Sequence, residues 1–171
     1  MSYFVVDVEA DGPCPGLYSM ISLGAVEITD NKVGSTFYAE FSPISEDWIP
    51  EALAISGFSR EETLKFESPE NSMIKFNKWI KETSKGRPIF ISDNIAFDWM
   101  WVCYYFHKYL KQNPFGFSGR RIADIICGLE KDLRFKWKDY RRTKHDHNPL
   151  NDSMANAEAF IYFLNKHNLK I

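Results

Sequence analysis

The sequence YFVVDVEADG, residues 3–12, begins with four residues that favour a buried β-strand, and Asp11-Gly12-Pro13 then forms a turn signal. Alternate side chains of a strand point to the same face, so Asp7 and Glu9 share a face about 7 Å apart. Two carboxylates on a buried strand repel each other unless a cation lies between them. Hard divalent cations take oxygen ligands. The pattern therefore indicates a metal site, although solvent-facing charges at a strand end would look the same.

Two further strand patterns follow directly. Residues 20–28 form a second apolar run, Asp30-Asn31-Lys32 is a hairpin turn, and residues 34–41 alternate well enough to be the partner strand. The first forty residues therefore predict an antiparallel three-stranded meander.

The rest of the chain alternates helix and strand patterns. Ser59 and Glu62 form a capping box, residues 69–84 and 95–110 have helical patterns, residues 88–91 form a short strand, and residues 122–129 are a short helix or strand–helix. Asn148 and Pro149 begin a last helix as N-cap and first helical residue. The order predicts an α/β fold, a mixed sheet with a meander and parallel strands and with helices packed on it.

Length and composition narrow the class of protein. The 171 residues predict one domain over 1–171, and the 21 basic and 23 acidic residues exclude a highly basic protein that wraps nucleic acid. Three widely separated cysteines argue against a disulfide framework or zinc ribbon and favour a reducing, cytoplasmic setting. We find no signal peptide, and the longest apolar stretch, residues 95–106, is too short to span a bilayer, so we expect no membrane association.

Two further carboxylates and a histidine are candidate site residues. Asp98 lies in the most apolar stretch of the chain, where burial without compensation is costly, although a narrow polar stripe on a helix would also explain it. Asp152 lies in the first turn of the last helix, where the helix dipole alone favours a carboxylate. His147 stands just before this helix, and His145 is a nearby competitor that we place farther out on the loop.

Taken together, the segments DVEADG (7–12), NIAFD (94–98) and HNPLND (147–152) resemble the DEDD superfamily of 3′–5′ exonucleases, in its branch with a catalytic histidine (DEDDh). This branch includes oligoribonuclease, RNase T and proofreading exonuclease domains. AISGF (54–58) and IADIICGL (122–129) are weaker matches. The resemblance spans nearly the whole chain and looks closest to small stand-alone bacterial exoribonucleases.

The resemblance implies a ribonuclease H-like fold with helices on both faces of the mixed sheet. It implies that Asp7, Glu9, Asp98 and Asp152 hold two divalent ions, Mg²⁺ or Mn²⁺, and that His147 is the general base. It also implies contacts of the substrate with the backbone amide of Ala10, with Ser56 where relatives often have histidine, and with Phe97, which could equally be a core residue.

The segment 130–147 contains seven basic and four acidic residues, with Phe135, Trp137 and Tyr140 interleaved. Basic side chains for phosphates and rings for bases are what a single-strand binding strip needs, so we single out Arg141 and Arg142. A solvated loop with a buried aromatic side explains the segment equally well.

We predict a 3′–5′ exonuclease that acts on single-stranded nucleic acid, RNA in preference to DNA, and releases nucleoside 5′-monophosphates. The alternatives are another ribonuclease H-like nuclease such as an endonuclease, a catalytically silent nucleic-acid-binding module, or a structural protein with accidental carboxylates. Family members often dimerise, so a homodimer is compatible with the aromatic-rich sequence.

Overall fold

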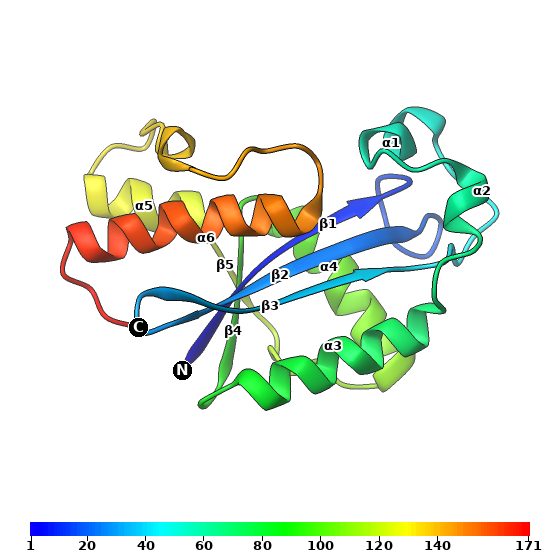
Figure 1. The fold of residues 1–171 in the computed structure, drawn as a ribbon, viewed down its shortest axis with the longest axis horizontal. Helices are drawn as coiled ribbons and strands as arrows, with labels where there is room; N and C mark the ends of the chain where they lie inside the picture. The colour runs from blue at the N-terminus through cyan, green and yellow to red at the C-terminus, as the bar shows by residue number, and fades with distance from the viewer.

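A computed structural model describes all 171 residues of the chain. Its centre is a five-stranded sheet in the order β3-β2-β1-β4-β5 (Figure 1). The strands are β1 (Ser2–Ala10), β2 (Met20–Thr29), β3 (Lys32–Glu40), β4 (Pro88–Ser92) and β5 (Gly119–Arg121). The first three strands are antiparallel neighbours, whereas β4 runs parallel to β1 and β5 runs parallel to β4. The predicted meander and mixed sheet are confirmed.

Helices cover both faces of this sheet (Figure 1). They are α1 (Pro50–Ile55), α2 (Arg60–Thr63), α3 (Pro69–Thr83), α4 (Ile95–Tyr105), α5 (Ile122–Glu130) and α6 (Pro149–Lys166), with a π-helix η1 (Phe106–Leu110) and a 3₁₀ helix η2 (Trp137–Tyr140). The helices α3 and α4 pack on one face, and α5 and α6 on the other. None of these helices is both long and apolar enough to cross a lipid bilayer.

Some elements differ from the sequence-based prediction. The strand β5 was not predicted, because its three residues are Gly-Arg-Arg and only parallel pairing with β4 makes them a strand. The short helix α1 was also not predicted. The predicted helix over residues 95–110 is α-helical only to Tyr105, and then widens into η1, which ends at a left-handed Lys111.

The alternation in β1 explains where the site can form. Phe4, Val6 and Val8 pack under α3 and α4, whereas Tyr3 and Val5 pack under α5 and α6. The α6 face of the strand then continues with the two carboxylates of residues 7 and 9. The central strand therefore presents its acidic side chains where α6 begins.

Gly24 in β2 determines how closely α6 approaches the sheet. A methyl group at this position would lie 2.2 Å from the carbonyl carbon of Pro149 and from the backbone nitrogen of Leu150. The Ser153 hydroxyl donates a hydrogen bond to the Gly24 carbonyl oxygen (2.9 Å). Because Gly24 has no side chain, the first turn of α6 rests directly on the sheet beside β1, which places Asp152 near the end of the central strand.

Candidate active site

Four carboxylates converge at the carboxyl end of β1. Asp7 and Glu9 come from β1, Asp98 from the first turn of α4, and Asp152 from the first turn of α6. Carboxylate oxygens of Asp7, Glu9 and Asp152 lie within 4.8 Å of one another. The Asp98 charge raises the pKa of Asp7, as expected for close neighbours. The structure thus brings together all four acidic residues that the sequence singled out.

Burial and mutual repulsion disfavour the charged forms of these groups. Burial raises the pKa of Asp7 well above its usual range, and the charges of Asp98, Glu9 and Asp152 raise it further. Burial, followed by the charge of Asp152 and then that of Asp98, raises the pKa of Glu9 to about 8. Burial is the main cause that raises the pKa of Asp98 to about 7. The cluster therefore lacks a cationic partner among its own side chains.

Two buried carboxylate oxygens of the cluster have unused bonding capacity. Asp98 Oδ2 and Asp152 Oδ2 are both buried and have no hydrogen-bond partner. The side chain of Asp152 is only 3% exposed. A buried carboxylate oxygen without a partner is costly, and a coordinated cation removes that cost. The donor set of oxygens fits a hard divalent cation such as Mg²⁺ or Mn²⁺.

The loop before α6 places His147 beside the cluster. His147 Nδ1 lies 3.7 Å from Glu9 Oε1, and the side chain is half exposed. The residue has a φ of 61°, a left-handed conformation that is uncommon for residues other than glycine. The Asp146 carboxylate holds this turn by accepting hydrogen bonds from the Asn148 amide and the Asn151 side chain.

The structure corrects our placement of His145. Its Nδ1 atom lies 2.7 Å from Asp152 Oδ1, so His145 is not farther out on the loop but in contact with the cluster. The rings of His145 and His147 are 4.7 Å apart. Sequence spacing could not reveal this contact, because it depends on the path of the loop before α6, which includes a left-handed residue at His147.

An open pocket of about 340 Å³ adjoins the carboxylates at Glu9. Ala10 and Phe97, two residues that the resemblance implied as substrate contacts, line it together with Gly12, Pro13, Ile49, Ala52 and Ile55. Ser56 does not line the pocket. Its hydroxyl donates to the Leu53 carbonyl oxygen (2.7 Å) at the end of α1. The pocket wall is therefore mainly apolar and ends at the acidic cluster.

Residues 2–164 match the family model of the 3′-5′ exoribonuclease Rv2179c-like domain. The chain belongs to this family. The chain is also 36% identical over 169 residues to the 3′-5′ DNA exonuclease Cap18 of Escherichia coli, with 91% of this chain and 87% of that protein covered.

Solved structures share the fold. The nuclease domain of 3′hExo, a DEDDh family member bound to rAMP, superposes with a TM-score of 0.76 at 15% identity, covering 96% of this chain and 92% of that one. Exonuclease I of Escherichia coli, in complex with an oligonucleotide, superposes with a TM-score of 0.69 at 18% identity, covering 96% of this chain and 40% of that one. The family model and the relative of 36% identity thus show a 3′–5′ exonuclease. Its fold is that of DEDDh, ribonuclease H-like exonuclease domains, which depend on divalent metal ions.

The two arginines that we singled out in this exonuclease differ in their surroundings. Arg141 is 12% exposed and pairs with Asp93 (3.0 Å), while its guanidinium also donates to the Asn156 side chain and lies over the Trp137 ring. Its Nη2 atom thus links the segment to Asp93 before α4 and to Asn156 of α6, while its Nε is buried without a partner. The expected contact of Arg141 with the substrate stays a prediction, and it would have to form beside this ion pair.

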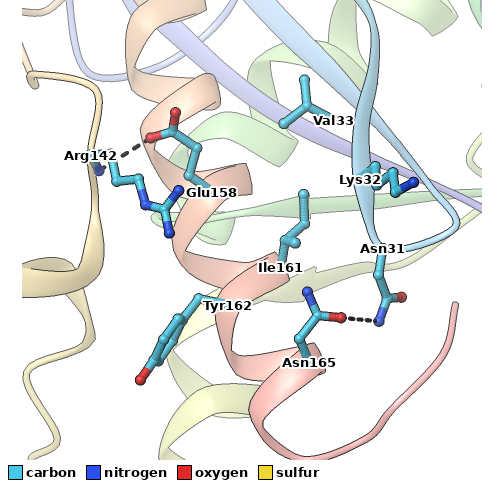
Figure 2. A pocket seen from close by; sticks show the side chains of 8 residues that line it. All are labelled: Asn31, Lys32, Val33, Arg142, Glu158, Ile161, Tyr162 and Asn165. Carbon is cyan, nitrogen blue, oxygen red and sulfur yellow. Dashed lines mark hydrogen bonds between the residues drawn. The ribbon is translucent and has the colours of Figure 1, made fainter.

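Arg142 remains exposed. Its side chain lines a pocket of about 410 Å³ against the outer side of α6, beside Glu158 and Tyr162 (Figure 2). The Arg142 amide donates to the Glu158 carboxylate (3.1 Å). None of the four site carboxylates lines this pocket, so it is separate from the carboxylate cluster.

Gly24 is a residue that the sequence analysis did not identify as important for the site. The only local signal is a glycine in the middle of an apolar strand pattern, which indicates close backbone approach. Only the packed structure identifies the backbone of Pro149 and Leu150 as the neighbour.

Proposed function

We propose that this exonuclease removes nucleotides one at a time from the 3′ end of single-stranded nucleic acid, RNA in preference to DNA, and releases nucleoside 5′-monophosphates. The observation that carries the proposal is the cluster of four carboxylates, two of them with unpartnered buried oxygens, at the end of an apolar pocket. Residues 1–171 would act as one exonuclease domain, because all five strands belong to a single sheet.

Asp7, Glu9, Asp98 and Asp152 would hold two divalent ions, Mg²⁺ or Mn²⁺. When bound, such ions supply activation of the attacking water and stabilisation of the leaving oxygen in phosphodiester hydrolysis. The charges agree with this assignment, since four carboxylates nearly neutralise two divalent cations and leave the phosphate to complete their coordination. The raised pKa values of Asp7, Glu9 and Asp98 support this assignment, because bound cations would relieve the unfavourable burial of their charges.

His147 would act as the general base that takes a proton from the attacking water. Its half-exposed ring is close to Glu9 and can turn toward a water molecule at the cluster. A histidine can accept a proton near neutral pH, which suits this role. Asp146 would position the histidine, because its hydrogen bonds hold the left-handed turn.

The 3′-terminal nucleotide would lie in the pocket beside Glu9. Ile49, Ala52 and Phe97 offer an apolar wall for the base, and the Ala10 backbone amide can contact the sugar. Ser56 is the weakest member of the proposed substrate-binding set, because its hydroxyl already donates within α1.

RNA is proposed as the preferred substrate because the family description names an exoribonuclease. DNA is the second candidate, because the curated relative of 36% identity is described as a DNA exonuclease. The preference can be measured directly with single-stranded RNA and DNA of the same sequence and 5′ label, resolved by length after incubation with Mg²⁺ or Mn²⁺. Faster shortening of the RNA supports our proposal, and faster shortening of the DNA supports the second candidate.

The same assay tests the reaction itself. Asp7→Asn should abolish shortening of the labelled strand. Asp139→Asn, which changes an exposed carboxylate of η2 outside the cluster, should leave the rate of shortening unchanged. Cleavage of a circular substrate would favour an endonuclease, and binding without any cleavage would favour a silent binding module. A homodimer and a cytoplasmic location remain part of the proposal. The three unpaired cysteines support the latter.

A further inference from the structure

A second group of metal-ligating side chains overlaps the carboxylate cluster at Asp152. Ligand atoms of His145, His147 and Asp152, here called the His145 triad, all lie within 4.8 Å of one another. His145 Nδ1 is already 2.7 Å from Asp152 Oδ1, and the two histidine rings are 4.7 Å apart. The triad differs from the four carboxylates in chemistry, because two of its three donors are imidazole nitrogens.

We propose that the His145 triad binds Zn²⁺ and that the bound ion inhibits the exonuclease. Zn²⁺ takes histidine nitrogens and carboxylate oxygens at about 2.0–2.2 Å, whereas Mg²⁺ prefers an all-oxygen shell. A set of two imidazoles and one carboxylate therefore selects Zn²⁺ over Mg²⁺. Three protein ligands leave the fourth position of a tetrahedral ion to water.

The triad needs little rearrangement to close on an ion. His145 and His147 are 49% and 51% exposed, so rotation of their side chains can bring both rings to the ion. Asp152 is held in place, because it is 3% exposed and its Oδ1 accepts a hydrogen bond from the Asp146 amide (3.2 Å). The other oxygen, Oδ2, is buried without a partner. The carboxylate therefore offers a fixed anchor with unused coordination capacity.

Inhibition follows from the residues that the two sites share. Zn²⁺ on the triad engages the imidazole of His147 and takes an oxygen of Asp152 from the carboxylate cluster. This part of the inference rests on the proposed role of His147 as general base. His145 contacts Asp152 but is not one of the four carboxylates, so its substitution removes a ligand of the triad and none of the carboxylate cluster.

Zn²⁺ binding can be measured without activity. Isothermal titration calorimetry with Zn²⁺ in excess Mg²⁺ compares the wild type, His145→Ala, and His107→Ala, which removes an exposed histidine of η1. We expect the wild type and His107→Ala to bind one Zn²⁺ with the same affinity, and His145→Ala to bind it about tenfold more weakly or worse. The visible absorption of Co²⁺ used as a spectroscopic substitute should change in the same variant.

The activity arm uses Mg²⁺-supported hydrolysis with added Zn²⁺. The Mg²⁺-supported rate of His145→Ala, compared with its own rate without Zn²⁺, should resist added Zn²⁺, whereas His107→Ala should be inhibited like the wild type. Equal Zn²⁺ affinity of the wild type and His145→Ala would place the ion in the carboxylate cluster and overturn the proposal. Zn²⁺ bound through His145 without loss of turnover would overturn its inhibitory role. If the wild type is inactive with Mg²⁺, the proposed function fails, while calorimetry still decides whether the triad binds Zn²⁺.

Discussion

Glu9→Gln should make the metal-free protein more stable at alkaline pH. The substitution keeps the shape of the side chain and removes its charge. Burial first, and the charges of Asp152 and Asp98 after it, raise the pKa of Glu9 from 4.5 to about 8. The folded state therefore holds on to a proton that the unfolded chain releases near pH 4.5. The contribution of Glu9 to the unfolding free energy is therefore most favourable below pH 4.5, and it becomes less favourable as the pH rises to about 8.

The size of the effect follows from the shift. Each pKa unit corresponds to about 1.4 kcal/mol, so the rise in the pKa of Glu9 costs roughly 3–4 kcal/mol of unfolding free energy between pH 5 and pH 8. Glu9 is 14% exposed, so solvent screening reduces this value only slightly. For a protein of this length the difference corresponds to roughly 10 °C in Tm. The Glu9 charge also raises the pKa of Asp7, so the measured relief includes that coupling.

Urea unfolding in excess chelator gives the unfolding free energy of the wild type and of Glu9→Gln at pH 5 and at pH 8. The quantity to compare is the difference in unfolding free energy between the variant and the wild type, taken at pH 8 and at pH 5. A packing cost of the glutamine that does not depend on pH cancels in this comparison. Glu51→Gln, at an exposed glutamate, is the matched control and should follow the wild-type curve. Saturating Mg²⁺ should make the wild type the more stable of the two proteins at pH 8, because it gains more binding free energy than the variant. Parallel pH curves for the wild type and Glu9→Gln in chelator would refute the electrostatic argument.

Four further outcomes are expected. His147→Ala should lower kcat by about 10²–10⁴-fold while Mn²⁺ binding, measured by calorimetry, is retained; unchanged kcat would remove His147 as the general base. Gly24→Ala should cost about 1–3 kcal/mol of stability and weaken metal binding because it pushes α6 off the sheet, whereas Gly128→Ala, which meets no neighbour, should be tolerated in thermal and calorimetric measurements. Arg141→Ala should cost about 1–3 kcal/mol in urea unfolding, because Asn156 loses its donor while Asp93 keeps Lys138 as a partner. Arg142→Glu should leave stability within about 0.5 kcal/mol and reduce the salt dependence of substrate binding; salt dependence equal to the wild type would remove Arg142 from the binding surface.

Local sequence rules were sufficient for most of the secondary structure. The apolar run before Asp7, the two-residue turn at Asp30-Asn31 and the Asn148-Pro149 helix start each depend on neighbours within a few residues. The same rules placed Asp7 and Glu9 on one face of a strand, because side-chain alternation is a local property. The strand β5 could not be predicted in this way, since its Gly-Arg-Arg sequence becomes a strand only through pairing with β4.

The sequence by itself determined which acidic residues lie on which elements, and only the tertiary structure decided what surrounds them. Asp7 and Asp152 are far apart in the chain, and their closeness depends on the missing side chain of Gly24. For Arg141 the sequence left both a substrate contact and a solvated position open, and only the fold shows its ion pair with Asp93. His145 likewise became a neighbour of Asp152 only through the folded loop. Burial, charge repulsion and unpartnered oxygens depend on distances across the fold, and those distances are set by how elements pack rather than by any local pattern of residues.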